Sequence, residues 1–437
     1  MSNEDDAEEL VDFDQAAYHV YFNSEPYNRY ITKWGSRAEY SYAFDSLSSE
    51  MHQYWNEIKQ PESERLKKLQ FCKDLKEAIK RNCPTWNFDV VPTGSSVTGL
   101  AAKNSDLDIT IHIPQATMAF VERHEPIDVR AKEKHAINVA SFSILRIVRR
   151  ILENDEQIKN KIMRSRDQNY IQLVPASIQI LSLVTADGIE CDIGVVIEDF
   201  LSSLHNSFLL NHFNRIEPRF APLCAIIKLW ADKTEVRKPK EGGFNSYAIV
   251  LLIIHFLQCG TYPPILPHLP KVYEKDEFFA QNEHTFPACV DFSKPLPRAL
   301  PEVTKNASNI AQLFLQFLNY YVDFNFHKNY ISLPTGKVQN RKELDPEKAR
   351  LHHQKSVYIE DPYDNHNPGR TVRNLAAIRE AFRSTLALFE PVDDVFTCPT
   401  LEQLLNCQIA RGELIYDNDD NSDDEEVDNF DFDDPVY

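Results

Sequence analysis

Two aspartates separated by a single residue, Asp106 and Asp108, carry the strongest chemical signal in the sequence. Apolar and polar side chains alternate over residues 107–113, as they do in a β-strand with one buried face. Side chains two positions apart in a strand point to the same side, so the two carboxylates should project together. Adjacent anions need a cation, and Mg²⁺ binds carboxylates while it keeps water and phosphate ligands. The pair therefore predicts a metal site.

A glycine followed by a serine, Gly94-Ser95, stands upstream of the aspartates, after a strand-like stretch at 88–92. Glycine lets the backbone approach a ligand closely. The free N–H groups and the dipole at the start of a helix favour phosphate. A phosphate clamp beside metal-binding carboxylates is the minimal equipment for nucleotidyl transfer, so we expect Gly94 and Ser95 to contact a nucleotide.

A third acid is expected, because in a two-metal reaction one ion activates the attacking hydroxyl while the other steadies the leaving group. Asp192, in a strand-like stretch at 189–196, is the best candidate. Glu190 on the same strand face and Asp187 in the preceding turn are the alternatives. The expected cofactor is Mg²⁺, with Mn²⁺ as an alternative, held by Asp106, Asp108 and Asp192.

The first half of the chain should fold around a sheet. Apolar residues at helical spacing predict helices at 47–59, 62–80 and 136–152, the first two separated by Pro61. Strand patterns occupy 88–92, 107–113, 171–176, 178–184 and 189–196. This order predicts an α+β catalytic domain with a mixed sheet over residues 61–219. We expect the preceding segment, 16–60, to pack its helix on the second half of the chain.

Long apolar helical stretches replace the strand patterns after about residue 219. They lie at 222–233, 247–258, 309–324 and 371–389. A helical central domain over 220–412 is therefore expected, interrupted by a polar, basic stretch at 334–355 that reads as a loop.

The net charge of -19 comes entirely from two acidic tails, 1–15 and 413–437, which contain no lysine or arginine. The tails should be disordered. Because the rest of the chain is formally neutral, the net charge does not argue against an anionic substrate. Hydrophobic residues make up 43% of the chain, which excludes global disorder. The cysteines form no C-x-x-C pair and should be reduced packing residues. No apolar run is long enough to span a membrane and no leader is evident, so we expect no membrane association and a cytoplasmic location, with a nuclear presence as an alternative.

Gly94-Ser95, Asp106-x-Asp108 and the later strand aspartate together resemble the pattern of the polymerase-β-type nucleotidyltransferases. The following segments resemble, more narrowly, the branch of terminal uridylyltransferases and poly(A) polymerases. The resemblance covers roughly residues 45 to 390. It implies a palm domain whose mixed sheet bears the acids, a helical central domain that closes over the nucleotide, and an NTP and an RNA 3′ end as substrates.

The resemblance also implies nucleotide contacts outside the acids. Asn206 and Ser207 match an element that touches the ribose. Ser246 and Tyr247 match an element in which the serine meets phosphate and the tyrosine stacks on the base. Stacking of this kind is worth about 1–3 kcal/mol and tolerates any base.

Lys228 resembles the first of two lysines that reach the triphosphate in this family. The second, expected four positions later, is Asp232 here. Either Lys233 substitutes from one position further on, about 100° round the helix, or the triphosphate is held differently.

Residues 359–370 resemble the family's nucleotide-recognition loop, in which an acid-Pro-aromatic segment lines the base pocket and a histidine marks the uridine-adding members. An imidazole N–H at His366 would satisfy the O4 acceptor of uracil but would face the amino group of adenine. Asp361 and Asp364 are the expected polar partners in the loop, which is one residue shorter than the usual form. We therefore expect UTP to be preferred over ATP.

A basic track beside the catalytic strands, which includes Arg146, Arg149, Arg150 and Arg164, is the candidate path for the RNA backbone. No RNA-recognition module is evident, so target choice by the monomeric enzyme should either come from a protein adaptor or be loose. The alternatives are adenosine addition by the same chemistry, a catalytically idle RNA-binding scaffold, and transfer to a small molecule or a protein.

Overall fold

The computed structural model describes residues 38–114, 133–163, 171–174, 179–197, 202–261, 264–266, 306–361, 363, 366–390 and 397–406, without side chains at 38–42 and 133–139. The two predicted acidic tails, Arg164 and Asp364 lie outside these residues.

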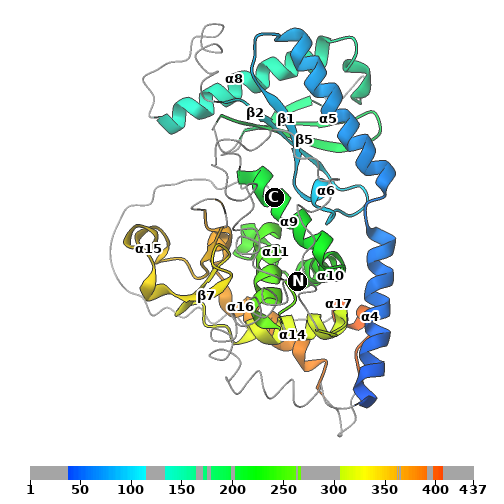
Figure 1. Ribbon diagram of the computed structural model, residues 1–437, viewed down its shortest axis with the longest axis vertical. Coiled ribbons are helices and arrows are strands. Elements are labelled where there is room, and N and C mark those ends of the chain that lie inside the picture. The colour runs from blue at the N-terminus through cyan, green and yellow to red at the C-terminus, as the bar shows by residue number, and fades with distance from the viewer. Residues whose placement is uncertain are drawn as a thin grey trace, which may run out of the picture.

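A five-stranded sheet forms the upper part of the molecule in Figure 1. Its order is β1-β2-β5-β4-β3. The strands are β1 (Asp89–Thr93), β2 (Leu107–His112), β3 (Ile171–Val174), β4 (Ile180–Val184) and β5 (Glu190–Val196). β2 and β5 run parallel, and the other neighbours are antiparallel. The mixed sheet and the α+β class are as predicted.

Two long helices, α5 (Glu62–Asn82) and α8 (Glu133–Asn154), pack side by side against the sheet. They bury the apolar face of β2, where Leu107, Ile109 and Ile111 are almost completely inaccessible. Because side chains alternate along a strand, the aspartates of β2 and β5 lie on the opposite face of the sheet from this core.

A second hydrophobic core fills the lower part of the molecule, which is mostly helical, as predicted. Its helices are α4 (Ala38–Ile58), α9 (Ser202–Ile216), α10 (Phe220–Lys233), α11 (Ser246–His255), α14 (Ile310–Val322), α16 (Leu375–Ala387) and α17 (Leu401–Leu405). The Trp230 ring stacks on Phe382 at 5.1 Å between centroids, and its Nε1–H donates to Thr385 Oγ1 at 2.8 Å. None of the described helices is both long and apolar enough to span a membrane.

Helix α4 lies along this lower part rather than on the sheet (Figure 1). Phe44, Leu47 and Met51 join the second core. Helix α9 connects the two parts, since Leu209 and Phe213 belong to the second core while other residues of α9 contact β1.

The prediction of a loop at 334–355 was wrong. This stretch contains β7 (Lys337–Asn340) and the helix α15 (Pro346–His352). With β6 (Asn329–Ser332) and β8 (Ile359–Glu360), β7 forms a second sheet, in the order β7-β6-β8. β7 is an edge strand whose side chains are all half-buried, so it lacks the alternation that reveals a strand. α15 has no buried residue and starts at an Asp345 cap, so apolar periodicity could not indicate it.

Short elements connect the main ones. They are α6 (Ser95–Thr98), a π-helical turn at Phe256–Gly260 after α11, and 3₁₀ turns at Lys159–Lys161, Pro239–Glu241, Arg341–Glu343 and Pro368–Thr371.

Candidate active site

Two of the three predicted catalytic acids lie side by side on parallel strands. Asp108 of β2 is the register partner of Asp192 of β5. Asp106 stands immediately before β2, and Thr93 of β1 faces Asp108 from the other side. The pairing of β2 with β5 thus gathers acids that are distant in sequence.

Gly94 lies against Asp108 at the end of β1. It has a left-handed backbone, with φ of +71°, and a Cβ placed there would come within 2.3 Å of Asp108 Oδ2. Its N–H donates to Ser207 Oγ at 3.1 Å, and Ser207 in turn donates to the carbonyl oxygen of Ser203. Glycine is therefore required for α6 to begin against the carboxylate. Ser95 opens α6 with a half-buried side chain.

Burial and neighbouring charges raise the pKa of two of these carboxylates. Burial, followed by the charges of Asp192 and Asp106, raises the pKa of Asp108 to about 7. Burial and the charges of Glu190 and Asp192 also raise the pKa of Asp106. Carboxylates close enough to repel in this way suit a shared cation.

Mg²⁺ fits this arrangement. Within the described part of the chain no three or more ligands form a ready-made metal cage. Mg²⁺ does not need one, because it keeps several waters and commonly takes only one or two carboxylates together with substrate phosphates. The raised pKa of Asp108 and the cradle left by Gly94 beside Asp108 are the observations that support the fit.

Mg²⁺ should raise the melting temperature more at about pH 8 than at about pH 6. Because the pKa of Asp108 is raised to about 7, its carboxyl holds a proton below that pH, which the metal must displace. Without metal, the same shift makes Asp108 lower the free energy of unfolding as pH rises from about 4 to about 7. Thermal melts with and without Mg²⁺ measure both effects. Asp108→Asn is the control and should lose them; an equal Mg²⁺ effect at both pH values would contradict the expectation.

A buried lysine that sequence reasoning missed supports the loop before β2, which carries Ser105 and Asp106. Lys68 of α5 is 1% exposed. Its Nζ donates to Ser105 O at 2.6 Å and to Ser105 Oγ and Ser96 Oγ at 3.0 Å, and it pairs with Glu64 at 3.1 Å. Ser96 Oγ then donates to the carbonyl oxygen of Asp106 at 2.8 Å. The ammonium thus anchors the backbone on which Asp106 stands.

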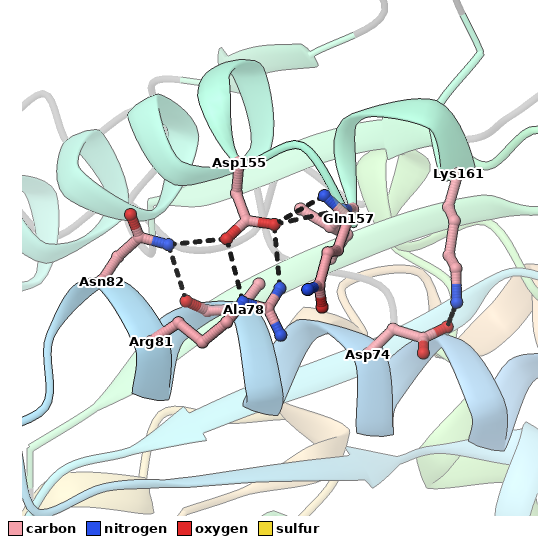
Figure 2. Close-up of polar contacts among 8 residues, drawn as sticks. Asp74, Ala78, Arg81, Asn82, Asp155, Gln157 and Lys161 are labelled. Carbon is pink, nitrogen blue, oxygen red and sulfur yellow. Dashed lines mark hydrogen bonds and ion pairs between the residues drawn. The ribbon is translucent and has the colours of Figure 1, made fainter.

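Ion pairs fix α5 to the chain that follows α8, on the face of the sheet opposite the aspartates (Figure 2). Arg81 and Asn82 donate to Asp155, and Lys161 pairs with Asp74. The hydrogen bonds from Arg81 in particular lower the pKa of Asp155 to about 2. These contacts hold the helix that carries Lys68.

Part of the predicted basic track is paired within the protein. Arg149 contacts Glu153 at 2.9 Å, and Lys159 and Lys161 pair with Glu156 and Asp74. Arg146 and Arg150 are exposed, and the Arg146 guanidinium lies 6.0 Å from the Phe142 ring centroid. RNA binding by this surface stays a prediction.

Of the predicted base-binding residues, Tyr247 and Asp361 meet where α11 and the 359–370 segment converge beside α9. The Tyr247 hydroxyl donates to Asp361 Oδ2 at 2.9 Å, and the Tyr363 N–H donates to Asp361 Oδ1 at 2.9 Å. The Tyr363 ring packs on His205 of α9, with centroids 5.2 Å apart. His366 is exposed, and its Nδ1 lies 3.4 Å from Arg370 NH1. Asp361 therefore orients Tyr247 from a buried position.

The two predicted ribose residues differ in surroundings. Asn206 has a buried Oδ1 without a hydrogen-bond partner among the described residues, which leaves an acceptor for a sugar hydroxyl. Ser207 is buried, and its hydroxyl already accepts a hydrogen bond from the Gly94 N–H and donates one to the carbonyl oxygen of Ser203. Its direct contact with a nucleotide stays a prediction, but its support of Gly94 is in place.

Lys228 and Ser246 flank an ion pair that the sequence did not indicate. Arg237 donates from Nε and NH2 to the carboxylate of Asp232, and from NH1 to Ser246 Oγ at 2.6 Å. Burial, with a further contribution from Arg237, lowers the pKa of Lys228. Lys233 is exposed at the end of α10.

Comparison with known proteins gives matches in both parts of the chain. A family model described as the central palm domain of mitochondrial-like poly(A) RNA polymerase matches residues 47–215. A second, described as Cid1 family poly A polymerase, matches residues 309–367. These ranges include the three acids and the first part of the predicted base loop.

Curated relatives include poly(A) RNA polymerase GLD2 of Bos taurus, 25% identical over 338 residues, and GLD2-B of Xenopus laevis, 28% identical over 342 residues. Each match covers 76% of this chain. The chain spans only 61% of the bovine protein and 57% of the frog protein.

Solved structures share the fold. The GLD-2/RNP-8 complex aligns with a TM-score of 0.60 and 24% identity, over 84% of this chain and 99% of that one. A structure of Cid1 described for its RNA terminal uridylyl transferase activity aligns with a TM-score of 0.57 and 22% identity, over 83% of this chain and 98% of that one. The described fold is thus the one that these nucleotidyltransferases have.

Proposed function

The chain belongs to the polymerase-β-type nucleotidyltransferases, in the branch that holds poly(A) and poly(U) RNA polymerases, and from this premise we propose that it adds uridylate to RNA 3′ ends without a template. The observation that carries nucleotidyl transfer is the pairing of Asp108 with Asp192 beside Gly94, and the choice of uridylate rests on His366. In this reaction the RNA 3′-hydroxyl attacks the α-phosphate of UTP, and pyrophosphate leaves.

Each part of the site has a task in that reaction. Asp106, Asp108 and Asp192 would hold Mg²⁺, or Mn²⁺ in its place, which when bound activates the 3′-hydroxyl and stabilises the leaving group. Gly94 leaves room beside Asp108 for α6 and the phosphates. Tyr247, held through its hydroxyl by Asp361, offers its ring to the base.

Uracil selection would depend on His366. An arginine guanidinium only donates hydrogen bonds, so the contact between Arg370 NH1 and His366 Nδ1 favours the tautomer with its proton on Nε2. That N–H matches uracil O4 and opposes the amino group of adenine. An unsatisfied donor costs about 1–3 kcal/mol, which is roughly a 5- to 150-fold preference.

A nucleotide competition tests the proposal directly. Purified protein with one unstructured RNA, Mg²⁺ and each of the four NTPs in turn should extend the RNA fastest with UTP. Equal extension with UTP and ATP would leave RNA nucleotidyl transfer standing but would remove the uridylyl assignment.

His366→Asn should raise the kcat/KM for ATP relative to UTP by roughly 5- to 150-fold, because it removes the imidazole donor and part of its bulk. The ratio is measured under competition in a single reaction. His353→Asn, another exposed histidine of the described part, is the control and should leave the ratio unchanged. An unchanged ratio in His366→Asn would mean that base choice lies elsewhere.

Adenylyl transfer is the second candidate, and one observation favours it: the curated relatives above are named poly(A) RNA polymerases. A catalytic core with the same acids would serve either base, so only the base pocket separates the two. Faster extension with ATP would establish this alternative.

The proposed partners follow from the same chemistry. The substrates are UTP and an RNA 3′ end, and a protein adaptor would choose the RNA. The solved complex of GLD-2 with RNP-8 shows that one relative binds a protein partner. We further propose that the enzyme itself is a monomer that acts in the cytoplasm.

A further inference from the structure

The resemblance assigns Lys228 and Ser246 to the phosphates of the nucleotide, but it leaves the position of the family's second lysine, on helix α10, without a cation. Asp232 occupies the position where the family resemblance leads one to expect a second lysine. A lone carboxylate there would repel a triphosphate, but Asp232 is not alone. Both of its oxygens accept hydrogen bonds from Arg237.

The backbone holds Arg237 in this position. Its N–H donates to the carbonyl oxygen of Ala231 at 2.9 Å, which ties it to the last turn of α10. The loop then closes on itself, since the Phe244 N–H donates to Val236 O at 2.8 Å. A Cβ at Gly243 would lie 2.5 Å from Val236 O, so the closure is tight. The chain after Arg237 therefore returns directly to Ser246 at the start of α11.

The Arg237 guanidinium has donors to spare. Nε and NH2 each donate to Asp232, and NH1 donates to Ser246 Oγ. One N–H on NH1 and one on NH2 have no partner among the described residues. The side chain is 27% exposed, so it is partly accessible to solvent. A planar guanidinium with free N–H groups on both terminal nitrogens suits the paired oxygens of a phosphate.

Lys233, the nearest alternative, has no such surroundings. It is exposed at the end of α10 and makes no described contact with Lys228 or Ser246. Arg237 contacts Ser246 directly and lies close enough to Lys228 to influence its ammonium.

We propose that Arg237, positioned by Asp232, binds the outer phosphates of the incoming nucleotide together with Ser246 and Lys228. The inference rests on the proposed function for the identity of the ligand. In this chain an acid that orients an arginine takes the place of a lysine that would contact phosphate itself. Asp232 is then a positioning residue, and Arg237 contacts the substrate.

Arg237→Gln tests the proposal. The substitution should raise the KM for UTP by about 10- to 100-fold, the range expected for a charge-assisted hydrogen bond, with a smaller effect on kcat. Binding of inorganic tripolyphosphate should weaken by a similar factor, while the affinity for UMP stays within about twofold. Lys238→Gln, which removes a cation of the same loop that pairs with Glu235 and Glu241, is the matched control and should change none of these values.

A rescue separates a phosphate contact from a structural role. Asp232→Lys introduced into Arg237→Gln should restore most of the tripolyphosphate affinity. It places a cation on α10 four residues after Lys228, on the same face of that helix. If Arg237→Gln does not fold, because Asp232 is left unpaired, Asp232→Asn/Arg237→Gln replaces it in the same titrations.

Three outcomes would overturn the inference: unchanged tripolyphosphate binding by the variant, an equal loss of UMP binding, or no rescue by lysine at 232. The proposed function fails separately, if none of the four NTPs allows the wild-type protein to extend RNA. In that case the tripolyphosphate titration still decides whether Arg237 binds phosphate.

Discussion

Asp108→Asn and Asp192→Asn should each lower kcat for RNA extension by about 10³-fold. A metal ligand contributes several kcal/mol to the stabilisation of the transition state, and about 1.4 kcal/mol corresponds to a factor of ten. Without metal, both variants should melt at or above the wild-type temperature. The reason is that Asp108→Asn removes the carboxyl whose pKa is raised by burial and by its neighbours, and Asp192→Asn removes a charge that raises the pKa of both Asp106 and Asp108. Single-turnover extension and thermal melts measure the two effects.

The controls for this experiment are the two other acids near the third position. Asp187 is exposed in the turn and pairs with Lys67 at 3.0 Å, so Asp187→Asn should retain activity within about twofold, as expected for a surface pair. Glu190 is exposed at the start of β5, and Glu190→Gln should have an intermediate effect through its charge on Asp106. If Glu190→Gln abolishes extension and Asp192→Asn does not, the third ligand is Glu190.

Sequence periodicity was sufficient to predict an element and the direction of its side chains where one face of the element is buried. The alternation over β2 puts Leu107, Ile109 and Ile111 in the core and Asp108 on the other face, so strand and carboxylate orientation could be predicted together. The parallel pairing of β2 with β5 could not, because nothing local specifies a partner strand. We expected Asp192 beside the first pair because a two-metal reaction needs a third acid and because Asp192 lies in a strand pattern, and the register places Asp108 and Asp192 side by side.

The residues that support the acids were not predictable for a different reason. Lys67 and Lys68 are adjacent and chemically identical, yet Lys67 is exposed and Lys68 is 1% exposed beneath the loop. Glu64 and Lys68 have the spacing of an ordinary surface pair on a helix. Likewise, Asp232 lies in α10 but Arg237 lies in the loop after it, and neither helical nor strand spacing indicates which side chains meet there. Both contacts arise from packing between distant segments or from loop closure.

Lys68→Met should lower the free energy of unfolding by about 3–5 kcal/mol, because it leaves the carboxylate of Glu64 with little solvent and no cation. Activity should also fall, since the anchors on Ser96 and Ser105 are lost. Chemical denaturation gives the first quantity and RNA extension the second. Lys67→Met is the matched control one residue away, and its surface pair with Asp187 should contribute less than about 1 kcal/mol.

The double variant Lys68→Met/Glu64→Gln distinguishes positioning from stability. Removing both charges takes away the uncompensated carboxylate, so most of the lost stability should return. The amide at position 64 can still accept from the Asn104 N–H, as Glu64 does at 3.2 Å. The double variant lacks the ammonium that donates to Ser105 O and Oγ, so kcat should stay about 10- to 100-fold low, the usual loss when a group that supports a metal ligand is removed. Full activity in a stable double variant would mean that Lys68 only stabilises the fold. A persistent loss, accompanied by weaker Mn²⁺ binding, would mean that the lysine sets the position of Asp106.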